Sequence, residues 1–320
     1  MSEQASPEES ERKNSWTTRL AAGLGVLAVG AGIWWATTDT NSGDKIVYDP
    51  TEEVAPNING TTTLISWNMH GEASNYLDEI NLMIDTYKVD AFLAQEVTDN
   101  DIETMLGDKR FKGMSIARVT TDSTTKGGYN NIIITPQRIE EDDVTTVAMA
   151  GNRKKIEPVI ETFKGILEID NPEDKVKDIS DATQEDRAAI GVPLLMATSE
   201  GVAKVRVITT HVGGDPKVHQ EQFEKNMKFI VDNKSGDEDL LICGDFNSSF
   251  EQVALAFAAK GFIAFPSRPT TTGEHGTEPK QIDICLQEAS EDSNLHLASV
   301  RVLEDAKTDH KPVLLSVESR

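Results

Sequence analysis

Seven short apolar runs constrain the fold of this chain more than any other feature of its sequence. They are rich in Val, Ile, Leu and aromatic residues and are bounded by turn-forming residues, a pattern typical of buried β-strands. The runs are TTLISW, AFLAQE, YNNIIIT, AKVRVITT, DLLICG, QIDICLQ and PVLLSV, and they extend from residue 62 to residue 317. The sequence therefore predicts a protein built around β-sheet.

Two longer segments have apolar residues at mostly helical spacing, residues 74–88 and 216–231. The apolar runs do not alternate strictly with such segments, so we expect an α/β sandwich of two sheets with helices laid on them rather than a doubly wound fold. Residues 152–186 are expected to form a partly helical surface excursion, because Pro158 and Gly165 interrupt a helical period there.

The N-terminal part of the chain has the pattern of a segment directed to a membrane. Residues 1–19 form a polar leader that we expect to be disordered, and residues 20–36, LAAGLGVLAVGAGIWWA, contain no charge. Arg12, Lys13 and Arg19 precede this run, so the positive-inside rule places the N-terminus in the cytoplasm. We expect a transmembrane signal anchor, with a cleaved signal peptide and a buried core helix as the alternatives.

Either an anchor or a signal peptide would export the rest of the chain, as a membrane-bound or a secreted protein. Residues 37–60 are rich in Thr, Asp, Asn and Pro and are expected to form a linker. The folded domain is expected to span residues 61–320.

The net charge of the chain limits how it can bind polyanions. Lys and Arg number 31 and Asp and Glu 54, which gives a formal charge of -23. Such a charge repels phosphates, anionic membranes and nucleic acid unless a local basic patch or a metal ion reverses it. Only Cys243 and Cys285 are present, which excludes a cysteine-based zinc cluster, and we expect them to be buried free thiols unless export oxidises them.

Acidic, amide and imidazole side chains occur where the apolar runs end. Taken alone, each is explained by a turn, a helix cap or a histidine with an ordinary hydrogen-bond partner. Together they indicate one site if the ends of the strands converge, because rigid strands present their terminal side chains to a shared cleft. These residues are Asn68, Glu96, His211, Asp245, Asn247, Asp283, Asp309 and His310.

The residue types in this set indicate a particular chemistry. The carboxylates of Glu96, Asp245 and Asp309 and the amide oxygen of Asn68 are hard ligands, which suit Mg²⁺, or else Mn²⁺ or Ca²⁺, better than zinc. Two histidines without a nucleophilic serine or cysteine motif favour general acid–base chemistry with water as the attacking group. Such a set suits in-line phosphoryl transfer, and a bound cation would invert the local field of an acidic protein.

Six short motifs carry a resemblance to a known family. They are SWN at residues 66–68, QE at 95–96, TH at 210–211, GDFN at 244–247, QID at 281–283 and TDH at 308–310. In this order they resemble the endonuclease/exonuclease/phosphatase superfamily, and neighbouring residues are most similar to its DNase I and cytolethal distending toxin members. The resemblance implies a four-layered α/β (α+β) sandwich in which two packed mixed β-sheets are flanked by helices.

The resemblance also implies roles for the metal ligands and for one histidine. Glu96 would be the principal ligand of the metal ion, beside Asn68 and Asp309. His310 would be a general base or an imidazole that orients the phosphate, and Asp283 would hydrogen-bond this ring and fix its tautomer.

The remaining roles concern water, the leaving oxygen and the substrate. Asp245 would orient or deprotonate the attacking water, and the amide of Asn247 would support the phosphate oxygens. His211 would protonate the leaving oxygen or stabilise the transition state. Arg187 would reach the nucleic-acid backbone.

The sequence thus favours a hydrolase, an exported or membrane-anchored, divalent-metal-dependent phosphodiesterase, and within that class a DNase I-like endonuclease acting on DNA. A sphingomyelinase-like or phosphoinositide phosphohydrolase, with phospholipid as its substrate, is one alternative. A non-catalytic binding module on the same fold is another. An enzyme requires that Glu96, His211, Asp245 and His310 face a common cleft. The oligomeric state is left open.

Overall fold

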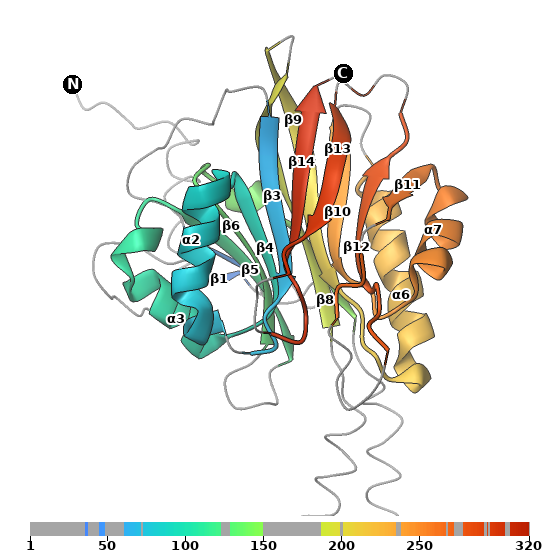
Figure 1. Cartoon of the computed structure of the whole chain (residues 1–320), viewed down its shortest axis with the longest axis horizontal. Coiled ribbons are helices and arrows are strands. Elements are labelled where there is room, and N and C mark those ends of the chain that lie inside the picture. Colours follow the sequence, from blue (N-terminus) through green and yellow to red (C-terminus); the bar gives the residue numbers. More distant parts are fainter. Residues whose placement is uncertain are drawn as a thin grey trace, which may run out of the picture.

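A computed structural model describes residues 36–37, 45–48, 61–71, 73–122, 129–149, 187–198, 201–234, 238–266, 268–271, 278–290, 293, 295–304 and 308–319. Two mixed β-sheets pack face to face in the middle of the molecule, and helices cover the outer face of each sheet (Figure 1). The predicted four-layered sandwich is therefore confirmed.

The first sheet has the strand order β1-β2-β5-β6-β4-β3-β14-β13. Strands β3 and β4 are parallel, and the other neighbours are antiparallel. The strands are β1 (Ala36–Thr37), β2 (Lys45–Tyr48), β3 (Thr61–Asn68), β4 (Ala91–Thr98), β5 (Ser115–Asp122), β6 (Tyr129–Thr135), β13 (Leu295–Val302) and β14 (Val313–Ser319).

The second sheet has the strand order β11-β12-β10-β9-β8-β7. Here β9 and β10 are the parallel pair. The strands are β7 (Thr145–Met149), β8 (Arg187–Thr198), β9 (Gly201–His211), β10 (Asp239–Asp245), β11 (Phe262–Phe265) and β12 (Asp283–Glu288).

The helices divide between the two outer faces (Figure 1). On the first sheet lie α2 (Leu77–Tyr87) and α3 (Asp99–Gly107), with the 3-10 turns η1 (Ala73–Tyr76) and η2 (Lys109–Phe111) beside them. On the second sheet lie α6 (Pro216–Asp232) and α7 (Phe250–Ala258), and η3 (Glu141–Asp143) precedes β7. Capping boxes at Thr98 and Ser249 start α3 and α7, because each side chain accepts a hydrogen bond from the N3 backbone amide.

Three apolar layers hold the sandwich together. The largest lies between the sheets and includes Leu64, Leu93 and Val207. A second layer lies between the first sheet and its helices and includes Trp67 and Phe92. The third lies between the second sheet and its helices and includes Phe246 and Phe257. Burial of this apolar area is the main favourable contribution to folding.

The folded part begins earlier than expected. Strand β2 lies within the range assigned to the linker, and β1 covers the last residue of the apolar run 20–36 and the first residue of the linker. β2 pairs with β5 from Lys45↔Val119 to Tyr48↔Ile116. The KIVY sequence of β2 has the β-branched and aromatic residues that favour a strand.

The leader at residues 1–19, the apolar run as far as residue 35 and the excursion at 152–186 lie outside the described residues. Within the described part of the chain, no helix is long and apolar enough to cross a membrane.

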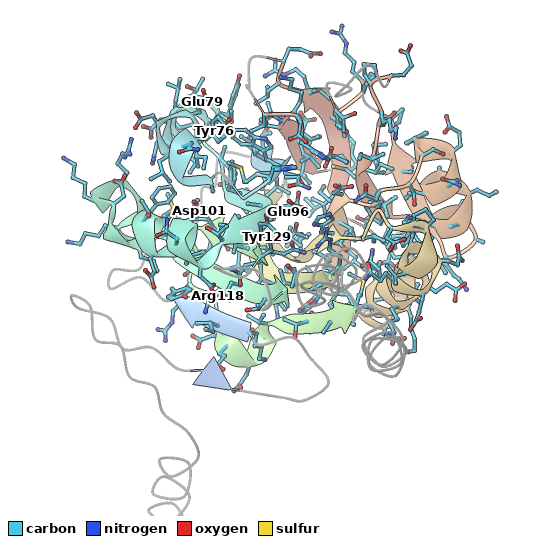
Figure 2. All side chains as sticks on the ribbon, turned by 90° about the horizontal axis from the view of Figure 1, so that it is seen from below. Tyr76, Glu79, Glu96, Asp101, Arg118 and Tyr129 are labelled. Atoms are coloured by element: carbon cyan, nitrogen blue, oxygen red, sulfur yellow. The ribbon has the colours of Figure 1, made fainter. Side chains whose placement is uncertain are left out.

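The sheet topology brings several strand ends to one edge of the sandwich. β3 and β4 end beside each other, with Asn68 opposite Gln95. In the second sheet β9 and β10 end together, with His211 opposite Asp245. This edge is at the bottom of Figure 1, where the downward strand β3 ends, and it faces the viewer in Figure 2.

Candidate active site

Strand register in the second sheet places three of the predicted residues in a row. Asp245 on β10 is the Cα partner of His211 on β9 and of Asp283 on β12. His310 joins them from the segment before β14, because its Nδ1 lies 2.9 Å from Asp283 Oδ2 and its Nε2 3.8 Å from Asp245 Oδ2. All four residues are buried. Segments far apart in the sequence therefore converge as predicted.

The GDFN turn depends on a glycine that no other residue could replace without movement. A Cβ at Gly244 would lie 2.0 Å from the carbonyl oxygen of Thr210 on β9. The turn then places Asn247 in the left-handed region, at φ 46°, with its backbone N–H donating to Asp245 Oδ1 at 2.8 Å. The Asn247 side-chain amide donates to the carbonyl of Val212 at 2.8 Å. Asn247 is thus fixed beside the carboxylate.

Glu96 reaches the site because strand β4 is irregular at that point. The pairing of β4 with β6 shifts between Ala94 and Val97, and Glu96 has φ 54°. Bulges of this kind redirect a side chain and are common beside active sites. The Glu96 Oε1 atom lies 3.5 Å from His211 Nε2. Figure 2 labels Glu96 near the middle of the edge that carries the site.

Gln95, the other residue of the QE motif, connects the two sheets. Its buried Nε2 donates to Thr209 Oγ1 on β9 at 2.7 Å and lies 3.3 Å from Ser66 Oγ on β3. Because Thr209 lies two residues before His211, this amide fixes the strand of Glu96 against the strand of His211.

Asn68 also joins the two sheets at the site. Its Nδ2 donates to Asp245 Oδ2 at 3.1 Å, while its Oδ1 accepts from the backbone N–H of His70 at 3.0 Å. Trp67 just before it donates from Nε1 to the backbone oxygen of His310 at 3.1 Å. The SWN motif therefore holds both Asp245 and the His310 segment.

Arg187 is the first residue of β8 and lies at the same edge of the sandwich as Glu96. Its guanidinium lies 3.8 Å from Glu96 Oε1, and only 12% of its side chain is exposed. The residue predicted to contact substrate thus lies beside the residue predicted to be the principal metal ligand.

Asp309 makes a contact that the sequence did not suggest. Its Oδ2 lies 3.3 Å from His70 Nδ1, and its Oδ1 accepts from the backbone N–H of His310 at 3.0 Å. His70 was not among the predicted site residues. The available signal was its position two residues after Asn68, just beyond the end of β3.

The two buried histidines have opposite electrostatic environments. Burial, together with the positive charges of Arg187 and His310, lowers the pKa of His211 well below its usual value, so this ring is neutral at pH 7. For His310 burial acts in the same direction, but the carboxylates of Asp283 and Asp245 outweigh it and raise the pKa to about 10. His310 is therefore an imidazolium at pH 7.

The acids of the site also differ from one another. Burial and the neighbouring Asp283 carboxylate raise the pKa of Asp245 to about 7. The hydrogen bond with His70 lowers the pKa of Asp309, and that bond, against the effect of burial, raises the pKa of His70 to about 9. Asp245 is therefore the carboxylate suited to exchange a proton near neutral pH.

The donor atoms at this edge fit a divalent cation. One side-chain atom each from Asp245, Asp283 and His310 lies within 4.8 Å of the other two. Because His310 is an imidazolium, only the carboxylate oxygens of Asp245 and Asp283 among these atoms can contact a cation. Asp283 Oδ1 is also buried and has no hydrogen-bond partner among the described residues, which leaves an acceptor available. The predicted ligands Asn68 and Glu96 border this cluster through Asp245 and His211. The set is rich in oxygen, as Mg²⁺ and Mn²⁺ prefer.

The arrangement as a whole combines a carboxylate with a raised pKa, an imidazolium held by a second carboxylate, and a neutral imidazole. It can accept a proton from water while placing N–H donors around a developing negative charge.

Comparison with solved structures identifies the fold. An endonuclease/exonuclease/phosphatase family protein from Bacteroides thetaiotaomicron has a TM-score of 0.53 at 14% identity, covering 81% of this chain and 98% of that one. A mannosyl-6-phosphatase from the same bacterium has a TM-score of 0.54 at 14% identity, covering 80% and 99%. TDP2 from D. rerio, complexed with a single-strand DNA product, has a TM-score of 0.51 at 13% identity, covering 82% and 100%.

The chain therefore has the endonuclease/exonuclease/phosphatase fold, as the motifs predicted. The sequence itself matches no protein-family model and none of the curated proteins.

Proposed function

We propose that this protein is a divalent-metal-dependent phosphoester hydrolase, and specifically a DNase I-like endonuclease that cleaves phosphodiester bonds of DNA with water. The single observation that carries the proposal is the convergence of His211, Asp245, Asp283 and His310, which come from separate strands and strand-flanking segments, on one buried cluster. A non-catalytic binding module would not need this alignment.

The roles follow from the contacts. The Asp245 carboxylate accepts the proton of the attacking water, since its pKa of about 7 makes it a base that is partly ionised at neutral pH. His310, held by Asp283, donates an N–H to a phosphoryl oxygen, and because it is already protonated at pH 7 it does not act as the base. His211 and the Asn247 amide lie 3.4 Å apart and bind the other oxygens, with the neutral His211 on the leaving side.

The proposed ligands of the metal ion are Glu96, Asn68 and Asp309. The ion, when bound, would supply positive charge that stabilises the phosphoryl oxygens. Mg²⁺ is the proposed ion, with Mn²⁺ or Ca²⁺ as substitutes. Arg187 is proposed to move between Glu96 and a substrate phosphate, since both are anionic partners for a guanidinium.

A nucleic-acid substrate is supported by the DNA product bound to TDP2, a protein of the same fold. The mannosyl-6-phosphatase of this fold makes a phosphomonoester the alternative to test first. Phospholipid is a further alternative, and it would fit the proposed N-terminal anchor or signal at residues 20–36, which would direct residues 61–320 out of the cytoplasm.

The test is nicking of supercoiled plasmid by the purified full chain. We expect nicking with Mg²⁺ or Mn²⁺, none with EDTA, and a loss of at least about a hundredfold in rate for His310→Ala. His296→Ala on β13 is the matched control, since this histidine lies outside the described cluster, and it should nick like the native protein.

Parallel reactions with RNA, mannose 6-phosphate, sphingomyelin vesicles and phosphoinositide vesicles separate the substrate classes. Release of phosphate or phosphocholine without plasmid nicking would show that the protein is a phosphomonoesterase or a phospholipid hydrolase rather than an endonuclease. Native rates in His310→Ala on every substrate would contradict the proposed mechanism.

A further inference from the structure

A histidine outside the buried cluster contacts the turn that carries Asn247. Helix α6 begins at the edge of the sandwich where the site lies (Figure 1), and His219 is in its first turn. The Nε2 atom of His219 lies 2.9 Å from Ser248 Oγ and 3.3 Å from the backbone oxygen of Phe246. An N–H at Nε2 can donate to both oxygens at once. Because Phe246 and Ser248 are the neighbours of Asn247 in the chain, one imidazole holds the turn on both sides of this residue.

Asn247 needs such support because of its backbone conformation. Its φ of 46° lies in the left-handed region, which non-glycine residues adopt rarely and keep only where the surrounding structure fixes them. The N–H of Asn247 donates to Asp245 Oδ1 at 2.8 Å, which ties the turn to the site. His219 ties the same turn to α6. The turn is therefore held between the end of β10 and the start of α6.

The same helix also holds the loop that follows His211. Gln222 lies three residues after His219, on the same face of α6, and is fully buried. Its Oε1 accepts a hydrogen bond of 2.8 Å from the N–H of Gly213, two residues after His211. The start of α6 therefore sets the position of Asn247 relative to His211, whose side-chain nitrogens lie 3.4 Å apart.

Packing fixes the orientation of the His219 ring. The ring stacks on Phe223, one turn further along α6, with the ring centroids 6.0 Å apart and an interplanar angle of 23°. Phe223 in turn packs edge-to-face on Phe246, with ring centroids 6.4 Å apart. A side chain holds its partners precisely when its own rotamer is locked by packing. The imidazole is thus preorganised to hold the turn.

We propose that His219 is a positioning residue that holds the GDFN turn so that the Asn247 amide stays beside His211 and contacts a phosphoryl oxygen in the transition state. The inference rests on the proposed function, which gives Asn247 and His211 that role. His219 acts through the Phe246 carbonyl and the Ser248 hydroxyl. A group displaced by about 1 Å can cost about a hundredfold in rate, so the effect is expected in kcat.

Plasmid nicking by the purified full chain tests the proposal with His219→Phe, which keeps an aromatic ring against Phe223 and loses the nitrogen atoms. We expect kcat to fall about tenfold with KM unchanged, because the lost interaction acts in the transition state. His219→Gln retains an N–H donor and should recover most of the rate. Gln220→Ala, at the exposed neighbouring residue that hydrogen-bonds Glu224, is the matched control and should keep native constants. A native kcat in His219→Phe, or a change in KM alone, would overturn the proposal.

Asn247→Gly separates positioning from a general structural effect, since glycine tolerates the left-handed backbone and lacks the amide. In this background His219→Phe should lower kcat by less than about twofold further, because the two residues act as one unit. A further tenfold loss would contradict the proposal. Should His219→Phe fail to fold, Ser248→Ala takes its place, with an expected loss of about threefold in kcat and a native kcat as the contradicting result.

Hydrogen exchange gives a readout that does not depend on activity. If the native protein cleaves no substrate, the proposed function fails, and exchange of the backbone amides of residues 246–248, measured by mass spectrometry, still tests whether His219 holds the turn. In His219→Phe these amides should exchange about tenfold faster, while those of strand β14 keep native rates. Equal rates at the turn in the two proteins, or the same acceleration in β14, would contradict the positioning role.

Discussion

Two histidines on the same edge of the sandwich show how strongly residue chemistry depends on immediate neighbours. His211 lies among Arg187, His70 and His310 and is neutral, whereas His310 is hydrogen-bonded to Asp283 and is protonated. The family resemblance implied that either His310 or Asp245 could act on the attacking water. We propose Asp245 for that role, because the raised pKa of His310 keeps this ring protonated at neutral pH.

The pH dependence of the native rate follows from these two groups. We expect kcat/KM to rise through about pH 7 as Asp245 loses its proton and to fall through about pH 10 as His310 loses its own. In Asp283→Asn the descending limb should move to lower pH, because the carboxylate that raises the pKa of His310 is gone. A pH–rate profile on the plasmid measures this shift.

Asp232→Asn, which removes an exposed carboxylate at the end of α6, serves as the control and should keep the native profile. A descending limb that stays in place in Asp283→Asn would show that His310 does not set it.

At this scale the sequence predicted residue types well and contacts poorly. Burying polar side chains at the ends of strands costs free energy, so their presence there indicates a functional role. This argument identifies the acids, amides and histidines of the site. The pairing of Asp309 with His70 depends on a loop meeting a turn 239 residues away in the chain. Local sequence does not encode such a contact.

Irregular elements do as much for the site as regular ones. The bulge in β4 directs Glu96 toward His211, and Gly244 allows β10 to approach β9 closely enough for Asp245 to face His211. Both features lie on strands that the apolar runs predicted. The bulge itself has no signal in the sequence, since it arises from the pairing of β4 with β6.

Gly244→Ala tests the close approach of the two strands. We expect a loss of about 3 kcal/mol in the free energy of unfolding, because the added Cβ meets the Thr210 carbonyl at 2.0 Å and neighbouring backbone must move. Urea denaturation measures the change.

Gly107→Ala provides the comparison, because this glycine ends α3 and has no atom within 4 Å of its added Cβ. It should be neutral or stabilising by about 0.5 kcal/mol. Equal stability of the Gly244→Ala and native proteins would show that β10 and β9 do not need this glycine.

Strands with mixed or interrupted patterns were the ones that sequence reasoning missed. All seven apolar runs form strands and both helical segments form helices in the structure. The apolar runs do not predict β8, because Pro193 interrupts the strand pattern of its sequence. The structure accommodates this proline because β7 pairs with β8 only as far as Gly191. Among the described strands, Pro193 therefore has β9 as its one neighbour. β13 lies at a sheet edge, and most of its residues are exposed or half-buried, so it has little apolar signal.

For the whole molecule, the question is how a chain with a charge of -23 approaches a polyanion. Its field is repulsive at long range, while Arg187, His70 and His310 gather positive charge at one edge. A bound cation would add to this local charge. Under the proposed function, an anionic substrate would be bound at this edge alone, and the rest of the negatively charged surface would repel it.

If the proposed function is right, salt should affect this protein differently from a basic nuclease. At fixed Mg²⁺, raising NaCl from about 20 to 150 mM shortens the Debye length and weakens the repulsion, so KM for plasmid should stay level or fall. A plot of log KM against log NaCl concentration that rises steeply would contradict this view, because such a slope indicates that binding releases several counterions from the DNA. Initial nicking rates over a range of plasmid concentrations give the required constants.

The most direct test of the central claim is anomalous diffraction from crystals of the protein soaked in Mn²⁺. We predict one strong peak at the edge where β3, β4 and β10 end, in contact with Glu96 and with Asn68 or Asp309, the proposed ligands. Absence of a peak at this edge, with the ion bound elsewhere or not at all, would contradict it.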